Sequence, residues 1–360
     1  MCIRDSHYRD PGETYKEDIE SGSNASAKGG FTTVVMMANT DPAIDSVDKV
    51  IEQRKTIENF SKIRALQTSA LTLSRKGKDL VDIDKLSLSG IVAFSDDGDV
   101  VDDKDLMVEG LKKSNEKKFF VLQHAEAKEL IDDGSANSGP PAIRMGLAAR
   151  SRHAEISIIK RDIQIAKENN LKLYFQHLST KESVDLIRIA KKEGVEIISE
   201  VTPHHLFLNE NWVYGKNGII PDFIDLDSYD TNFRVNPPIR QEEDRLALLE
   251  GIKDGTIDII ATDHAPHSDG DKLNTFDSAP AGINGAETAL PTLLTIVNKG
   301  ELHLTDVVRT MSNNPAKILN KLLDVNIGKL KKNFQADFTL IDNDKTVSYT
   351  HLRAHETSLH

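Results

Sequence analysis

The sequence predicts an α/β protein built as a (β/α)8 TIM-type barrel, and three observations support this fold class. Short apolar runs alternate with amphipathic stretches along most of the chain. Seven strand-like runs precede residue 264, and an eighth is expected just upstream of His7, which over roughly 250 residues matches the size of such a barrel. Polar residues end many different runs, whereas a doubly wound open sheet, the competing architecture, gathers its ligands at one crevice.

The predicted strands are apolar, mostly rich in β-branched residues, and most end at a polar residue. They cover residues 31–37, 63–71, 89–94, 119–123, 171–176, 195–201 and 257–261. Helical periodicity covers residues 43–60, 103–113, 142–169 and 241–253, and Ser179-Thr-Lys-Glu182 resembles a capping box that opens a further helix. Asn209 to Val235 is a long irregular segment around Trp212, which we interpret as a surface insertion.

The chain divides into a barrel over residues 7–322 and part of a small domain over residues 323–346. Residues 304–320 are predicted to be helical, and residues 328–330 and 335–341 are predicted to be short strands. We expect these strands to belong to a small β-sandwich domain formed by the chain termini. Residues 1–6 and 347–360 lack such patterns, so we interpret them as a non-native leader and tail and leave them out of the fold.

Composition excludes several classes of function. A formal net charge of −12 argues against nucleic acid or an anionic membrane as a partner. The single cysteine, Cys2, excludes an intramolecular disulfide and a thiolate metal site, as expected in a reducing cytosol. No apolar run approaches the length of a membrane span. The sequence therefore predicts a cytoplasmic protein, and an anionic substrate would need local arginine or metal charge.

Polar side chains gather at the ends of the predicted strands. They are His7, Asn39, Asp96, Asp97, His124, His177, His204, His205 and Asp263. Histidines that each end a separate apolar run, together with carboxylates, indicate a metal centre. Imidazole and carboxylate ligands without thiolate suit zinc in an open catalytic site, and two ions would need a bridging carboxylate, for which Asp97 is the candidate. Taken singly, Asp96 and Asp97 also fit a turn, His204 and His205 fit loop caps, and Asp263 fits a helix cap.

A second group of residues suits an anionic substrate. Arg9 follows His7 by two positions and therefore lies on the same strand face, where its guanidinium can bind a carboxylate through two hydrogen bonds. Asn39 and Asn236 each stand where an extended run turns, and two prolines after Asn236 fix its backbone.

In this order, the motifs resemble those of the bacterial class I dihydroorotases, in the cyclic amidohydrolase group of the amidohydrolase superfamily. The resemblance covers about residues 7–345 and rests on His7-x-Arg9-Asp-Pro-Gly-x-x-x-Lys-Glu-Asp18, Gly29-Gly-Phe-Thr-Thr-Val34, Ala38-Asn-Thr40, Phe94-Ser-Asp-Asp-Gly98, Gln176-His-Leu-Ser-Thr180, Thr202-Pro-His-His205, Asn236-Pro-Pro238 and Ala261-Thr-Asp-His-Ala-Pro-His267. It implies a zinc-dependent enzyme of pyrimidine biosynthesis that reversibly hydrolyses (S)-dihydroorotate to N-carbamoyl-L-aspartate. It also implies a homodimer and an association with aspartate carbamoyltransferase.

The resemblance assigns roles to individual residues. Two zinc ions would share Asp97, with His7 and Asp263 on the first ion and with His124 and His177 on the second. Asp263 would also be the catalytic acid–base, and His264 would support the site rather than bind metal. The residues that match substrate-binding positions of the family are Arg9, Asn39, Asn236, His267, Ala281 and Gly282.

The chain departs from the family pattern at two positions. Asp5 stands where the family has the first histidine of a His-x-His pair, and Ala38 replaces the usual proline. Two other functions stay open. One is another cyclic amidohydrolase, such as an allantoinase or hydantoinase. The other is a non-catalytic scaffold for aspartate carbamoyltransferase, which we expect to lose several ligands, whereas five of six are kept here.

Overall fold

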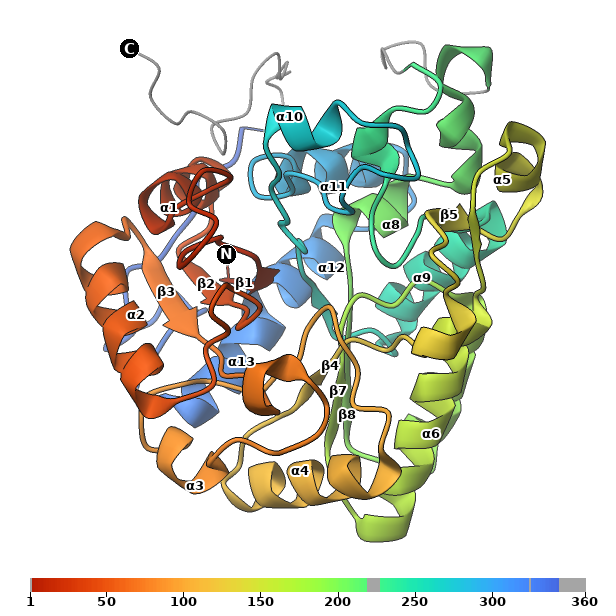
Figure 1. Ribbon diagram of the computed structural model, residues 1–360. Helices are drawn as coiled ribbons and strands as arrows, with labels where there is room; N and C mark the ends of the chain where they lie inside the picture. The colour runs from red at the N-terminus through yellow and green to blue at the C-terminus, as the bar shows by residue number, and fades with distance from the viewer. Residues whose placement is uncertain (1, 219–226, 324, 343–360) are drawn as a thin grey trace.

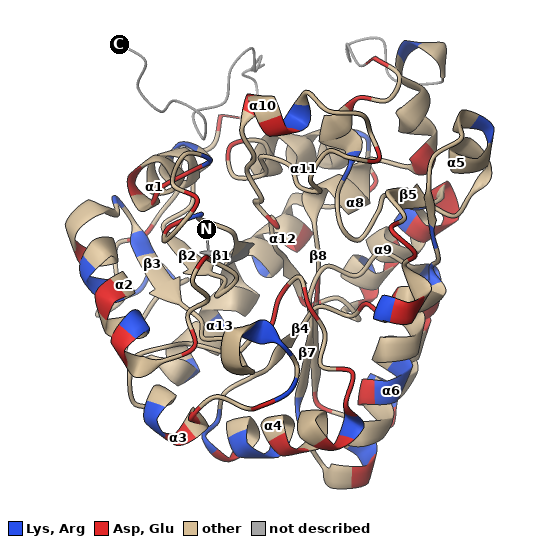
Figure 2. Cartoon of the chain, in the orientation of Figure 1, with Lys and Arg blue, Asp and Glu red and all other residues tan. Residues whose placement is uncertain are grey.

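Strands and helices alternate through the computed structural model, which describes residues 2–218, 227–323 and 325–342. Figure 1 shows the strands near the centre, with helices such as α2 (Val47–Phe60), α4 (Lys104–Glu116) and α6 (His153–Asn169) around the outside. Positions of charged residues of both signs are spread along these outer helices (Figure 2). Among the described residues, no helix has both the length and the apolarity needed to cross a membrane.

Two parallel sheets form the centre of the protein. The first has the order β1 (Cys2–Ser6), β2 (Thr33–Met36) and β3 (Arg64–Gln67). The second has the order β4 (Leu122–Gln123), β7 (Leu173–Phe175), β8 (Ile197–Val201) and β9 (Ile259–Ile260). A separate parallel pair joins β5 (Ala136–Asn137) to β6 (Ala149–Arg150). The α/β class predicted from the sequence is confirmed.

Isolated parallel bridges link the two central sheets at both of their edges. On one side, Phe94 bridges Ser69, just after β3, and Val121, just before β4. On the other side, Ser6 of β1 bridges His264, a few residues after β9. The strand predicted over residues 89–94 is therefore reduced to the single bridging residue Phe94.

Most strands are followed in the sequence by one or more helices. The remaining helices are α1 (Ile19–Lys28), α3 (Ile83–Leu86), α5 (Pro140–Met145), α7 (Lys181–Lys192), α8 (Pro203–Phe207), α9 (Glu242–Asp254), α10 (Asp269–Lys272), α11 (Ala289–Asn298), α12 (Leu304–Val308) and α13 (Asn314–Leu322). A π-helical turn, Arg309–Asn313, joins α12 to α13, so the helix predicted over residues 304–320 is continuous.

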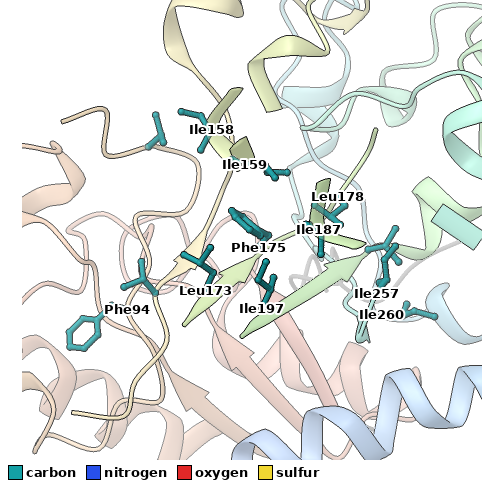
Figure 3. Packing of buried hydrophobic residues seen from close by; sticks show 14 of the residues in the cluster. Phe94, Ile158, Ile159, Leu173, Phe175, Leu178, Ile187, Ile197, Ile257 and Ile260 are labelled. Carbon is teal, nitrogen blue, oxygen red and sulfur yellow. The ribbon is translucent and has the colours of Figure 1, made fainter. Parts of the chain in front are cut away.

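Neighbouring residues of one strand pack into two different apolar clusters. In β7, Leu173 and Phe175 belong to the larger cluster, which Figure 3 shows in part, whereas Tyr174 belongs to the smaller one. In β9, Ile260 and Ile259 divide in the same way. Because successive strand residues point to opposite faces, this division means that both faces of the central strands are buried. That is why these strands are recognised in the sequence as uninterrupted apolar runs.

Two predicted helix boundaries are wrong. The helix expected over residues 142–169 is divided into α5 and α6, because Gly146 adopts a left-handed φ of 69° and ends α5. The cap of α7 is Thr180, whose hydroxyl accepts from the Ser183 amide, rather than the predicted Ser179. Ser179 is instead engaged with the buried carboxylate of Glu155.

The ends of the chain also differ from the prediction. Residues 2–6, set aside as a leader, form β1 and pair with β2, so the strand expected before His7 lies in that segment. Residues 328–330 and 335–341 are not strands, because no neighbouring strand in the described part of the chain pairs with them. The ion pair between Arg64 and Asp337, at 2.7 Å, holds this segment against β3. Residues 343–346 and the predicted tail lie outside the described residues.

We predict that Asp162→Asn stabilises the protein at alkaline pH. Asp162 lies in α6 with a fully buried side chain, and its Oδ1 accepts from Arg161 at 2.8 Å. Burial raises the pKa of this carboxyl to about 6, against the opposing charge of Arg161. Because the folded-state pKa lies above the unfolded value, the neutral form favours folding at low pH, and this contribution is lost as pH rises through 6.

At pH 8 the buried charge of Asp162 destabilises the folded protein by about 3 kcal/mol, because a difference of one pKa unit between the folded and unfolded states corresponds to about 1.36 kcal/mol. Asp162→Asn removes this destabilisation. Urea unfolding at pH 5 and pH 8 measures it. The gain from Asp162→Asn should be larger at pH 8, whereas the exposed control Glu52→Gln in α2 should show little change at either pH. A gain for Asp162→Asn that does not increase with pH would contradict the assignment.

Candidate metal centre

The histidines and carboxylates predicted as ligands come together at the carboxyl ends of the central strands. They are His7 after β1, Asp97 after the Phe94 bridge, His124 after β4, His177 after β7 and Asp263 after β9. All five side chains are buried. The carboxyl ends of parallel strands meet at one edge, which is why residues so distant in the chain become neighbours.

Asp97, His124 and His177 form the tightest group. One ligand atom from each can be chosen so that all three lie within 4.8 Å of one another. Asp97 Oδ1 lies 3.7 Å from His124 Nδ1 and 3.8 Å from His177 Nε2. The two imidazole nitrogens are 2.9 Å apart. Both rings therefore direct a nitrogen toward the same carboxylate oxygen.

His7 connects this group to Asp263. Its Nε2 lies 3.4 Å from Asp97 Oδ2 and 3.0 Å from Asp263 Oδ1. The two oxygens of Asp97 thus face two different sets of side chains, with His124 and His177 at one oxygen and His7 at the other.

The charges of this cluster fit a divalent cation. Burial by itself would raise the pKa of Asp97, but His7, His177 and His124 hold that pKa well below its ordinary value. Burial also opposes ionisation of Asp263, whose pKa is nevertheless lowered to about 2, chiefly by His7. Two ionised carboxylates among three imidazoles are the hard and borderline donors that zinc and similar ions prefer.

Two residues of the cluster have unusual backbone conformations. Asp263 has a φ of 45° and His177 a φ of 25°, in the left-handed region that residues other than glycine rarely adopt. Strained backbone of this kind is concentrated at functional sites, where the surrounding structure enforces it.

Two amide side chains brace Asp97 from opposite sides. Asn39 Nδ2 donates to Asp97 Oδ2 at 2.9 Å, and Asn39 Oδ1 lies 3.0 Å from His7 Nδ1. Gln176 Nε2 donates to Asp97 Oδ1 at 3.0 Å. Sequence reasoning missed Gln176 as a site residue, although its position directly before His177 was a usable signal. Asp96 points away from the cluster and accepts from the amides of Leu71 and Thr72 at 2.8 and 3.0 Å.

His264 is fully engaged outside the cluster. Its Nδ1 accepts from the amides of Gly285 and Ala286 at 3.1 and 3.3 Å, so its proton resides on Nε2. That nitrogen donates to the buried carboxylate of Glu17 at 3.0 Å. Neither ring nitrogen is therefore left for a cation. Sequence reasoning assigned no role to Glu17, although this residue lies within the motif that begins at His7.

The histidines of α8 have different surroundings. His205 receives a hydrogen bond from the Thr202 hydroxyl at 2.7 Å and donates to the carbonyl of Pro237 at 2.9 Å, so it fixes the local loops. His204 Nε2 is buried without a hydrogen-bond partner in the described part of the structure, and burial lowers the pKa of this imidazole to about 4.

A cleft of about 1120 Å³ opens beside the cluster and is lined in part by His204, Thr262, His267 and Gly282. Trp212 and residues 227–232 also line it, so part of the segment interpreted as a surface insertion borders the cleft. Residues 219–226 of that segment lie outside the described residues.

Two of the residues predicted to bind substrate, His267 and Gly282, line this cleft. His267 Nε2 donates to the carbonyl of Ala281 at 2.9 Å. Gly282 has a φ of 147°, and an added Cβ would lie 2.4 Å from the carbonyl oxygen of Ala265 and 2.9 Å from His267 Nε2. The backbone therefore approaches His267 more closely than any side chain would allow. Arg9 donates through Nε to the carbonyl of Pro266 at 3.1 Å.

Asn236 is held by charged groups behind His124. Its Nδ2 donates to Glu126 Oε2 at 3.0 Å, and its Oδ1 accepts from Arg150. Arg150 also pairs with Glu126 Oε1 at 2.8 Å. Burial would raise the pKa of Glu126, but the neighbouring His124, Arg150 and Asn236 lower it to about 2, so this carboxylate is ionised. Glu126 and Arg150 were not singled out from the sequence.

Comparison with known proteins gives a consistent result. A family model described as "Dihydro-orotase-like" matches residues 2–183. A dihydroorotase of Staphylococcus epidermidis is 43% identical over 337 residues, which cover 93% of this chain and 75% of the relative. A dihydroorotase of Clostridioides difficile is 39% identical over 340 residues, which cover 94% and 76%.

Solved structures share the fold at low sequence identity. The L-hydantoinase of Arthrobacter aurescens superimposes with a TM-score of 0.78 at 24% identity, covering 93% of this chain and 74% of that one. A Saccharomyces cerevisiae dihydroorotase in complex with 5-fluoroorotic acid gives a TM-score of 0.69 at 20% identity, covering 89% and 83%. At these identities the similarity extends to the fold alone.

We predict that zinc stabilises the protein through Asp97. Adding Zn²⁺ in excess to metal-stripped protein should raise the melting temperature by about 5 °C or more, because a ligand that binds only the folded state stabilises it. Asp97→Asn should abolish this rise, as measured by differential scanning fluorimetry.

Asp96→Asn is the matched control. It removes a neighbouring buried carboxylate that caps a loop and does not face the cluster. This variant should melt lower than the parent yet keep the zinc-dependent rise, so a rise retained in Asp97→Asn would refute the role of Asp97.

Proposed function

The chain belongs to the dihydroorotase family and is a metal-dependent cyclic amidohydrolase, and we propose that it catalyses the reversible hydrolysis of (S)-dihydroorotate to N-carbamoyl-L-aspartate. The observation that carries this proposal is the buried group of Asp97, His124 and His177 in a chain that is 43% identical to a dihydroorotase. The reaction belongs to pyrimidine biosynthesis.

We propose that the two central sheets close into a single (β/α)8 barrel. The parallel bridges at Phe94 on one side and between Ser6 and His264 on the other support this closure, because they join both pairs of sheet edges. In this arrangement residues 7–322 form the body of the barrel, and β1, which precedes them in the chain, supplies its first strand. Residues 323–346 would contribute to a small β domain.

We propose that two zinc ions bind at the strand ends and share Asp97. His7 and Asp263 would hold one ion, and His124 and His177 the other, since the two oxygens of Asp97 face these two sets. Bound there, the ions would polarise the ring carbonyl and make water a nucleophile at neutral pH.

Asp263 is the residue placed to move protons. Its pKa of about 2 keeps it in the basic form at neutral pH, and it touches His7 at 3.0 Å. In the hydrolytic direction it would take a proton as water adds to the ring carbonyl carbon. It would then give that proton to the ring nitrogen as the carbon–nitrogen bond breaks. Cyclisation reverses these steps.

The substrate carboxylate needs local positive charge in a chain with a net charge of −12. We propose that Arg9 supplies it, with Asn39 and His267 beside it. The backbone of Ala281 and Gly282 and the amide of Asn236 would bind the ring. The position of Gly282 in the wall of the cleft, packed directly against His267, supports this.

Two alternative functions are less well supported. The L-hydantoinase structure is 24% identical and shares only the fold, whereas the two dihydroorotase relatives are 39% and 43% identical. A non-catalytic scaffold would not need five buried ligand residues in contact with one another. The homodimer, the association with aspartate carbamoyltransferase and the cytoplasmic location stay predictions, which size-exclusion chromatography, co-purification and cell fractionation can test.

We predict that Asp263→Ala abolishes turnover without unfolding the protein. Loss of the acid–base alone costs about 10² to 10⁴ in rate, and Asp263 is also a proposed ligand. The measurement is the ultraviolet change on dihydroorotate cleavage, with circular dichroism as the test of folding. Asp105→Ala in α4 serves as an exposed control. Appreciable activity in a folded Asp263→Ala variant would exclude the assigned role.

We predict that Arg9→Ala raises the KM for dihydroorotate about tenfold or more with a smaller change in kcat, because a carboxylate anchor acts in both the ground state and the transition state. Arg144→Ala on the surface of α5 should leave KM unchanged. An unchanged KM in Arg9→Ala would count against Arg9 as the anchor.

A further inference from the structure

Glu126 lies directly behind the metal ligand His124 and is enclosed by hydrogen-bond donors. Its Oε2 lies 3.3 Å from His124 Nε2 and accepts from Asn236 Nδ2 at 3.0 Å. Its Oε1 accepts from Arg150 at 2.8 Å. Only 12% of the Glu126 side chain is exposed, so these contacts are shielded from water.

The two nitrogens of His124 have different partners. Nδ1 faces the cluster, 3.7 Å from Asp97 Oδ1 and 2.9 Å from His177 Nε2. A neutral imidazole carries one proton, so a ring that offers its Nδ1 lone pair to a cation must carry that proton on Nε2. The acceptor beside Nε2 is Glu126. In this tautomer the 3.2 Å contact between His124 Nε2 and Asn236 Nδ2 brings together two donors that share the same carboxylate oxygen.

We propose that Glu126 is a positioning residue that holds His124 in the tautomer and ring orientation required of a metal ligand, and that Arg150 holds Glu126 in place. A histidine ligand whose other nitrogen donates to a carboxylate is a stronger and better oriented donor. Glu126 does not touch the cluster itself, so it acts through His124.

The carboxylate of Glu126 also contacts Asn236, a residue proposed to bind the substrate. Because Asn236 donates to Glu126 Oε2, the oxygen that faces His124 also fixes the orientation of the Asn236 amide. This second link rests on the proposed function, in which Asn236 contacts the substrate ring. Through its Oε2 atom, Glu126 would thereby link His124 to the side-chain amide of Asn236.

A purely structural role for Glu126 predicts a different effect of its removal on metal affinity. If the carboxylate only neutralised Arg150, its removal would lower stability and leave the metal affinity of the folded protein unchanged. A tautomer-fixing role must weaken metal binding in a variant that remains folded. Glu126→Gln serves this purpose because it is nearly isosteric but presents one acceptor oxygen to donors from His124, Asn236 and Arg150.

The experiment measures zinc affinity in the absence of substrate. Metal-stripped protein is titrated with Zn²⁺ against a chromophoric chelator, and melting temperatures confirm folding. We expect Glu126→Gln to bind zinc about 10- to 100-fold more weakly than the parent. The matched control Glu129→Gln changes an exposed carboxylate three residues further along, and its affinity should equal that of the parent.

Arg150→Met distinguishes the effect of the hydrogen bond from His124 to Glu126 from the effect of the ion pair between Glu126 and Arg150. This variant keeps the acceptor for His124, so it should lose less zinc affinity than Glu126→Gln. An affinity for Glu126→Gln within twofold of the parent would overturn the role of Glu126, and an affinity for Arg150→Met equal to that of the parent would overturn the role of Arg150. Zinc affinity needs no turnover, so a parent protein that fails to cleave dihydroorotate would refute the proposed function while this inference is still tested independently.

Discussion

The buried carboxylate of Asp97 is the constraint on which the rest of the site depends. A charge removed from water is stable only when neighbouring groups compensate it. Here His7, His124 and His177 provide positive potential, and Asn39 and Gln176 donate hydrogen bonds. These partners come from separate strand ends, so the arrangement exists only while the parallel strands hold their register. A divalent cation bound between these side chains would compensate the same charge.

A second layer of buried charge holds the first in place. Glu17 fixes His264, whose ring also accepts from the loop at Gly285 and Ala286, and Glu126 with Arg150 stands behind His124. Arg150 balances the charge of Glu126, and Glu17 accepts a hydrogen bond from His264. Precision at the strand ends therefore comes from polar contacts around the cluster, whereas the apolar clusters on the two faces of the strands hold the strands themselves.

Hydantoinases and dihydroorotases share this fold, so the fold by itself does not determine which substrate this protein binds. We propose that the choice rests on Arg9, which offers a positive charge, and on His267, which lines the cleft and offers a ring nitrogen. Both residues lie in loops that follow strands, which is typical of catalytic sites on α/β scaffolds.

Apolar runs in the sequence were enough to locate β2, β3, β7, β8 and β9, because strands buried on both faces have a continuous hydrophobic pattern. Polar residues at the ends of such runs also identified the clustered histidines and carboxylates. Local pattern failed where distant partners decide: Phe94 alone bridges its neighbours, Glu155 takes Ser179 away from the cap of α7, and residues 335–341 lack a neighbouring strand among those described. The sequence already favoured Asp97 over Asp96 as a ligand. Only the tertiary structure showed that Glu17, Glu126 and Gln176 contact residues in and around the cluster, because the direction of a side chain depends on what surrounds it.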